Sequence, residues 1–166
     1  MVRLLNQADW GEDRGRIQRL KGWVYYPLLL EAYDTLQEEA LFPSAIHGPA
    51  HIYRVLLLSA LVCQGEGVGE GMVRQVFRAA SYHDVGRTFD GYDVDHGARS
   101  ALRLAELTGQ TGEALRELQA AVTAHARPDR EMEAVVASFH PQNLPRALEL
   151  TRLLKDADNL DRVRLG

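Results

Sequence analysis

The apolar positions along the chain recur mostly every three or four residues, a spacing typical of amphipathic helices that pack against one another. Leu, Ala, Glu, Arg and Gln are abundant while β-branched residues are sparse, so local propensity favours helix over strand. Proline, glycine and breaks in the apolar pattern place the expected helices at about 27–40, 49–64, 70–84, 96–107, 111–126, 131–138 and 145–158. The sequence therefore predicts an all-α bundle of about six to seven helices.

Three stretches stand out within this pattern. The helix expected at 49–64 carries little polar surface, which predicts a central position in the bundle. Four glycines fall within 65–71 and indicate a loop, and a second loop is expected from Thr88 to Asp95, after Gly86 has ended the preceding helix.

The length of 166 residues is that of one domain, which we expect to span 1–166 with 1–26 as an N-terminal flanking segment. The formal net charge of −4 gives no basic footprint, so sequence-specific nucleic-acid binding is not expected. The longest strongly apolar run, 55–63, is too short to span a bilayer, and the first residues lack the apolar core of a signal peptide. We therefore expect a cytoplasmic protein that makes no membrane contact. The single cysteine, Cys63, excludes an internal disulfide.

Four polar residues fall on the inward, apolar stripe of their own expected helices: His51, His83, His125 and Asp158. His51, for example, shares its face with Val55, Leu58 and Val62. A lone histidine of this kind is more often a satisfied core residue, and a buried polar group without a partner costs about 1–3 kcal/mol. Four such groups from four helices are satisfied together most simply by a divalent metal ion, because histidine nitrogen and aspartate oxygen both bind one.

Two neighbours extend this cluster less strongly. Asp84 follows His83 directly at the expected end of a helix, where both side chains could serve as ligands. His47 precedes His51 by four residues, but Pro49 indicates that the helix begins only after His47, which reads as a loop or cap residue.

The ordered set His51, His83-Asp84 and Asp158 resembles the HD superfamily of metal-dependent phosphohydrolases. The local contexts are similar too: His-Ile-Tyr-Arg-Val (51–55), Tyr-His-Asp-Val-Gly-Arg (82–87) and Lys-Asp-Ala-Asp-Asn-Leu-Asp (155–161). The resemblance implies an all-α metal-binding core over 47–161, with one divalent ion held by His51, His83, Asp84 and Asp158. Asp161 is the second choice for the final ligand.

His96 and His125 lie in the interval where two-metal branches of the superfamily carry two further histidines. A second ion is one interpretation. The alternative is that both histidines support the ligands of a single ion or bind substrate phosphate. The choice among Mn, Fe, Co, Ni, Mg and Zn stays open, because such ligand sets accept several of these ions.

The resemblance implies a small phosphorylated substrate. Arginine is the planar, permanently charged partner of phosphate, and Arg54, Arg87 and Arg99 are the candidates, with Arg87 also expected to act in catalysis. Asp93 and Asp95, in the loop after the His-Asp pair, are candidates for acid or base catalysis, as is Asp90. In the same loop, Phe89 or Tyr92 could stack on a base.

We therefore expect a metal-dependent phosphohydrolase that acts on a nucleotide or another small phosphorylated metabolite. Two alternatives stay open: a nucleotide-binding regulatory HD domain with little turnover, and an HD-like di-iron oxygenase. Association with a second copy of the chain is left open as well.

Overall fold

The computed structural model of the protein describes residues 11–162, so the first ten residues of the expected flanking segment lie outside the described part. Within that part, the chain forms nine α-helices, two short 3₁₀ turns and no strand. The helices are α2 (Arg14–Lys21), α3 (Tyr26–Asp34), α4 (Pro49–Glu66), α5 (Glu70–Tyr82), α6 (His96–Ala101), α7 (Leu104–Thr108), α8 (Gly112–His125), α9 (Asp129–Ser138) and α10 (Leu144–Arg162). The predicted all-α class is confirmed.

The number of described helices exceeds the expected six to seven for two reasons. The flanking segment contributes α2, and the helix expected over 96–107 is divided into α6 and α7 by a turn at Leu102 and Arg103. The helix expected to reach Ala40 ends at Asp34. Gln37 lies past that end, where its backbone N–H donates to Tyr82 and its side chain donates to Leu107 O, so tertiary contacts override the local helix propensity.

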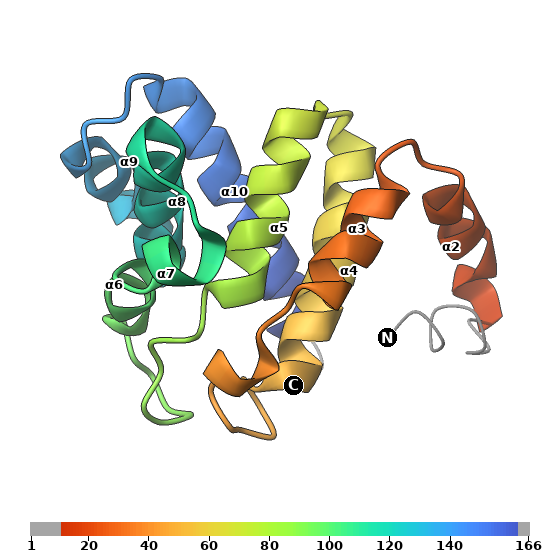
Figure 1. Cartoon of the computed structure of the whole chain (residues 1–166), viewed down its shortest axis with the longest axis horizontal. Helices are drawn as coiled ribbons and strands as arrows, with labels where there is room; N and C mark the ends of the chain where they lie inside the picture. Colours follow the sequence, from red (N-terminus) through yellow and green to blue (C-terminus); the bar gives the residue numbers. More distant parts are fainter. Residues whose placement is uncertain (1–10, 163–166) are drawn as a thin grey trace.

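The core lies between three long helices, with smaller elements on either side. In Figure 1, α4, α5 and α10 occupy the middle, α6 to α9 lie to one side of them, and α2 lies to the other. Helix α10 packs against both α4 and α8, while α5 packs against α4. A second small apolar cluster, built around Val136 and Leu148, fixes α9 to α8 and α10. No helix in residues 11–162 has the length and apolar character needed to cross a membrane.

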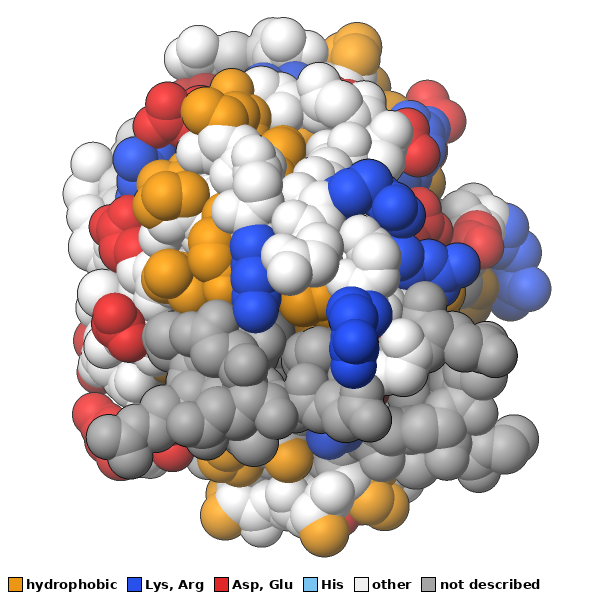
Figure 2. All heavy atoms as spheres, turned by 90° about the vertical axis from the view of Figure 1, so that its right-hand side faces the viewer, with side chains coloured by type: hydrophobic (Ala, Val, Ile, Leu, Met, Phe, Trp, Pro, Cys, Tyr) orange, Lys and Arg blue, Asp and Glu red, His pale blue; other side chains and the backbone are white. Residues whose placement is uncertain are grey.

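Helix α4 is central, although its buried face differs from the expected one. His51 and Val55 are buried, and that face continues through Ile52, Leu56, Ser59, Ala60 and Cys63. Leu58 and Val62, which we expected beside His51, are only half-buried. They line a cavity of about 670 Å³ between α2, α4 and α10. Figure 2 shows the side of the molecule that carries α2, where hydrophobic and basic side chains lie next to each other.

Two glycines allow backbones to approach closely beside the predicted site. A Cβ atom at Gly86 would lie 2.3 Å from the backbone nitrogen of Ser100 in α6, and one at Gly97 would lie 2.5 Å from the carbonyl oxygen of Val122 in α8. Both distances are too short for any residue with a side chain to be accommodated without a backbone shift. These contacts seat α6 on the turn after α5 and on α8.

Candidate metal centre

Five helices bring six histidine and aspartate side chains to one buried place. His51 lies in the first turn of α4, His83 caps the end of α5 with Asp84 in the turn behind it, and His96 begins α6. His125 ends α8, and Asp158 lies in the last turns of α10. Each of the six is exposed by no more than 4%. The four side chains expected to point inward from helical periodicity, those of His51, His83, His125 and Asp158, are all buried.

The first group of these side chains comes from the three long helices and from the turn that follows α5. The Nε2 atom of His51 lies 3.1 Å from Nε2 of His83 and 3.4 Å from Oδ1 of Asp158. The Oδ2 atom of Asp84 lies 3.6 Å from the same His51 nitrogen and 3.8 Å from that of His83. Four potential ligand atoms thus face one another across a small volume, which we call the first half of the centre.

The second half of the centre is formed by His96 and His125. Their Nε2 atoms lie 3.0 Å apart. The Oδ1 atom of Asp84 lies 3.1 Å from Nε2 of His96 and 3.9 Å from Nε2 of His125. Asp84 therefore stands between the two halves, with one carboxylate oxygen directed to each.

The partners of the other ring nitrogen fix the tautomer of all four histidines. The Nδ1–H groups of His83, His96 and His125 each donate to the carbonyl oxygen three residues earlier, those of Ala80, Asp93 and Val122. His51 donates from Nδ1 to the carboxylate of Asp161, at 2.7 Å. Because a carbonyl oxygen accepts only, Nδ1 carries the proton in each neutral ring, and Nε2 presents a lone pair to the centre.

This arrangement fits a bound cation. In the neutral rings, the Nε2 lone pairs of His51 and His83 face each other at 3.1 Å, and those of His96 and His125 at 3.0 Å. Both oxygens of Asp84 are buried and receive no well-oriented hydrogen bond in the described part of the chain, although the Nε atom of Arg87 lies 2.9 Å from Oδ1. Ligand atoms of one ion lie about 2.0–2.2 Å from it and hence about 3–4 Å from one another. In two overlapping sets the ligand atoms all lie within 4.8 Å of one another: His51, His83 and Asp158, and His83, Asp84 and His125.

The charge states of the centre suit metal binding as well. Burial alone would raise the pKa of Asp84, but the neighbouring His83, His125 and Arg87 hold that pKa well below its usual range. The pKa of Asp158 is likewise held well below its usual range, against burial, by His51 and His83. Burial lowers the pKa of His125 to about 4, so this imidazole is neutral at pH 7. Ionised carboxylates and neutral imidazole are the forms that bind metal.

The comparison with protein families agrees with this geometry. The family model described as HD domain matches residues 50–163, which is most of the chain. The chain belongs to the HD-domain family. Membership implies a superfamily of metal-dependent phosphohydrolase type, and the buried His/Asp groups of this HD domain could hold a divalent ion. No match to a curated protein was found. No match to a solved structure was found either.

Three carboxylates of the HD domain are each paired with an arginine around the centre. Arg87 contacts Asp84, and Arg162 donates from Nη2 to Oδ2 of Asp158 at 2.8 Å. Asp161, the alternative ligand in the sequence, instead lies behind His51 and receives two hydrogen bonds from Arg54. A carboxylate behind a metal-binding imidazole fixes its orientation and raises its basicity.

The loop between Arg87 and His96 carries the other expected residues, and two ion pairs hold its C-terminal end. Asp93 pairs with Arg99, which also donates from Nε to Gly86 O. Asp95 pairs with Arg127 at 2.7 Å. The structure thus places Asp93 and Asp95 beside arginines and brings neither into the set of close contacts around Asp84. Their expected acid–base role stays a prediction, as does phosphate binding by Arg54, Arg87 and Arg99.

His47 is closer to the centre than its sequence context indicated. Its ring lies edge-on to that of His51 with 5.7 Å between centroids, and its Nδ1 lies 2.9 Å from Oδ1 of Asp90. Ser44 binds the same carboxylate. Arg162 was also missed, and its i+4 spacing from Asp158 is the one signal that could have found it. No local signal joins His47 to Asp90, because 43 residues separate them.

Proposed function

We propose that this HD domain is a metal-dependent phosphohydrolase that acts on a nucleotide or another small phosphorylated metabolite. The observation that carries the proposal is the convergence of four Nε2 lone pairs and two ionised carboxylates, with every Nδ1 proton already engaged. A bound divalent ion would supply a Lewis acid for a phosphoryl oxygen and lower the pKa of a bound water.

We further propose that the centre holds two ions. His51, His83, Asp158 and Oδ2 of Asp84 would form the first site. Oδ1 of Asp84, His96 and His125 would form the second. Asp84 would then be shared, which accounts for a carboxylate whose two oxygens are buried, ionised and without a well-oriented donor.

In this proposal, Arg54 and Arg162 beside the centre bind the substrate phosphate. The side chains of Arg54 and Arg162 are 40% and 52% exposed, yet each is fixed by a buried carboxylate next to the ligand set. Each can keep its ion pair and still direct remaining N–H groups outward. Such planar, permanently charged groups suit the oxygens of a phosphate.

Proton transfer is assigned to His47. Its Nδ1 is held by Asp90, and its Nε2 has no hydrogen-bond partner among residues 11–162. Burial lowers the pKa of His47, while the bond to Asp90 opposes that shift, so a neutral ring at pH 7 can exchange a proton at Nε2. The hydrogen bond to the carboxylate of Asp90 keeps the imidazole of His47 in one orientation.

Two exposed aromatic residues of the same loop support a nucleotide over a smaller phosphate ester. Phe89 is 51% exposed and Tyr92 is 87% exposed, and they flank Asp90, which binds His47 beside the centre. Apolar rings left in water at the edge of a site offer a surface on which a base can stack, worth about 1–3 kcal/mol.

The test measures metal content and phosphate release together. Wild-type protein is loaded with Mn, Co, Ni or Mg and assayed for phosphate release over a panel of nucleotides and small sugar phosphates. His83→Ala and Asp84→Ala are made as loss variants. His140→Ala serves as the matched control, because His140 is exposed and outside the centre.

We expect the wild type and His140→Ala to bind metal and hydrolyse at least one nucleotide, and both loss variants to lose both properties. A protein that binds none of these metals and stays inert would overturn the proposal. A sample loaded with iron under anaerobic conditions tests the di-iron oxygenase alternative. If that sample reacts with oxygen and the protein releases no phosphate from any substrate, the oxygenase alternative replaces the proposal.

A further inference from the structure

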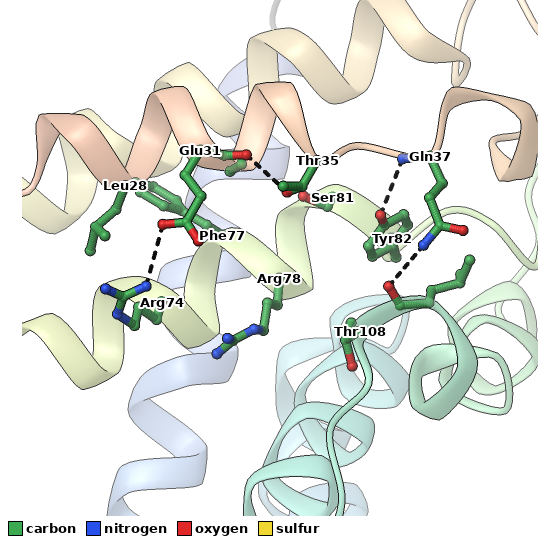
Figure 3. A pocket seen from close by; sticks show the side chains of 12 residues that line it. Leu28, Glu31, Thr35, Gln37, Arg74, Phe77, Arg78, Ser81, Tyr82 and Thr108 are labelled. Carbon is green, nitrogen blue, oxygen red and sulfur yellow. Dashed lines mark hydrogen bonds and ion pairs between the residues drawn. The ribbon is translucent and has the colours of Figure 1, made fainter.

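A cavity of about 300 Å³ lies on the opposite side of α5 from the metal centre, between α3, α5 and the end of α7. None of the six side chains of the centre lines it. Its volume is at the lower end of the range of small-molecule pockets in proteins. Figure 3 shows the side chains of α3 and α5 that face each other across it. This is therefore a second place, separate from the proposed reaction site, where a small ligand could fit.

The cavity has a fixed frame. Gln37 closes one end, because its backbone N–H donates to the hydroxyl of Tyr82 at 3.2 Å and its side chain donates to Leu107 O at 3.1 Å. Thr108 Oγ1 donates to Leu104 O within α7. Hydrogen bonds from Gln37, in the segment after α3, thus hold α5 and α7 in place before any ligand binds, which lowers the entropic cost of binding.

The charges that line the cavity are unequally compensated. Arg74 lies 2.9 Å from Glu70 and 3.5 Å from Glu31, so two carboxylates neutralise it. Arg78, one turn further along α5, has no ion pair and no hydrogen bond within the described residues. In Figure 3 its guanidinium extends away from Glu31, between Arg74 and Thr108. The cavity therefore presents one half-buried, uncompensated positive charge.

Hydroxyl groups and apolar surface complete the lining. The hydroxyl of Ser81, a residue only 4% exposed, has no hydrogen-bond partner among residues 11–162. Leu28, Phe77 and Leu107 provide the apolar wall. An uncompensated guanidinium, an unused hydroxyl and an apolar wall around one cavity are the features of a site for an amphipathic anion.

We propose that this cavity binds a small organic monocarboxylate with an apolar or aromatic body. The fork of the Arg78 guanidinium matches the two oxygens of a carboxylate, and Phe77 and Leu107 cover the apolar part. Glu31 on the opposite wall disfavours a second negative charge, so a dianionic phosphate ester fits less well. The proposal is independent of the reaction at the metal centre.

The test uses benzoate and hexanoate as probes and benzamide as their neutral counterpart. Binding is located by NMR, through the shifts of labelled methyl groups of Ala32, Leu28 and Leu107, because a carboxylate could also bind the metal centre. Arg78→Gln removes the proposed anchor. Arg152→Gln is the matched control, since Arg152 is exposed on α10 and makes no ion pair among the described residues.

We expect both carboxylates to shift these methyl signals and to bind at least about tenfold more tightly than benzamide, as a charged hydrogen bond requires. Arg78→Gln should lose about tenfold or more in affinity, while Arg152→Gln should bind as the wild type does. Equal binding of benzamide and benzoate, unchanged binding in Arg78→Gln, or no shift at millimolar probe would each overturn the proposal.

A second variant, Ala32→Leu, narrows the cavity and should weaken hexanoate binding while Arg78 remains in place.

Discussion

The two halves of the metal centre differ in how they are built. The first half takes its ligands from α4, α5 and α10, helices of 18, 13 and 19 residues. The second takes His96 from α6, which has six residues and is seated by glycine contacts on its neighbours. The first half is thus fixed by the main core, whereas the second combines His125, at the end of the 14-residue α8, with a short segment held by close backbone contacts.

The halves also differ in charge. Asp158 belongs to the first half alone, where its Oδ1 lies 3.4 Å from His51, whereas the second half has no carboxylate of its own among the described residues and shares Asp84. His51 is backed by the carboxylate of Asp161, but His96 and His125 are backed by carbonyl oxygens. More negative charge and more basic ligands favour a cation, so we expect the first half to bind its ion more tightly.

The largest effect on metal binding and phosphate release is expected for Asp84, the residue that both halves share. Asp84→Asn keeps the shape of the side chain but removes the charge that both halves share, so both ions should be lost. Phosphate release should fall by more than about a hundredfold, beyond the 10–100-fold typical of a residue that only orients a ligand. Elemental analysis and the phosphate assay check this, with exposed Asp156→Asn as control. Retention of two ions by Asp84→Asn would show that the carboxylate is not shared.

A smaller effect should separate the halves. His125→Ala removes one of the two imidazoles of the second half and none of the first, so the protein should keep one tightly bound ion and lose the other. His51→Ala should instead weaken the tighter ion. Isothermal titration with Mn or Co on metal-stripped protein measures both variants. If His125→Ala lost both ions together, the centre would behave as one cooperative site and the comparison of halves would fail.

The sequence predicts His96 less well than the other histidines of the centre, for physical reasons. His51, His83, His125 and Asp158 lie on or at the end of long helices, where a period of 3.6 residues places each of them on the apolar stripe of its helix. His96 begins a short helix with no such periodicity, and its position depends on Gly86 and Gly97, whose role appears only once α6 meets α8. The helix class was predictable from local pattern, whereas the early end of α3 depends on contacts of Gln37 with distant residues.

The surroundings of the centre were the least predictable part. Arg54 and Asp161 are 107 residues apart in the chain and meet only through the packing of α4 against α10. The pairing of His47 with Asp90 is a contact between two loops, which carry no periodic signal. Residue types alone indicated which side chains could bind phosphate or transfer protons. Tertiary contacts decide which carboxylate pairs with each of these arginine and histidine side chains.

Asp161→Asn tests the support of the first half. The amide keeps the size of the side chain but presents a weaker acceptor to Nδ1 of His51 and loses the charge that pairs with Arg54. Affinity for the tighter ion should fall by about 10–100-fold, while the second ion is little affected. Competition with a chelator of known affinity measures this, and Asp156→Asn again provides the control on the same helix. Equal weakening of both ions would assign Asp161 to the fold and not to the first half.

The smallest effect is a pH dependence that should also distinguish the halves. Burial would lower the pKa of His83, but Asp84 and Asp158 outweigh it, and the pKa is raised above its ordinary value of 6.5. As the pH falls through that raised pKa, a proton competes for Nε2 of His83, and affinity in the first half should decline by about tenfold per pH unit. His125, with a pKa of about 4, takes up no proton in this window. Metal titrations of His125→Ala at pH 8, 7 and 6 isolate the first half, and an affinity that stayed constant across them would show that no proton competes at His83.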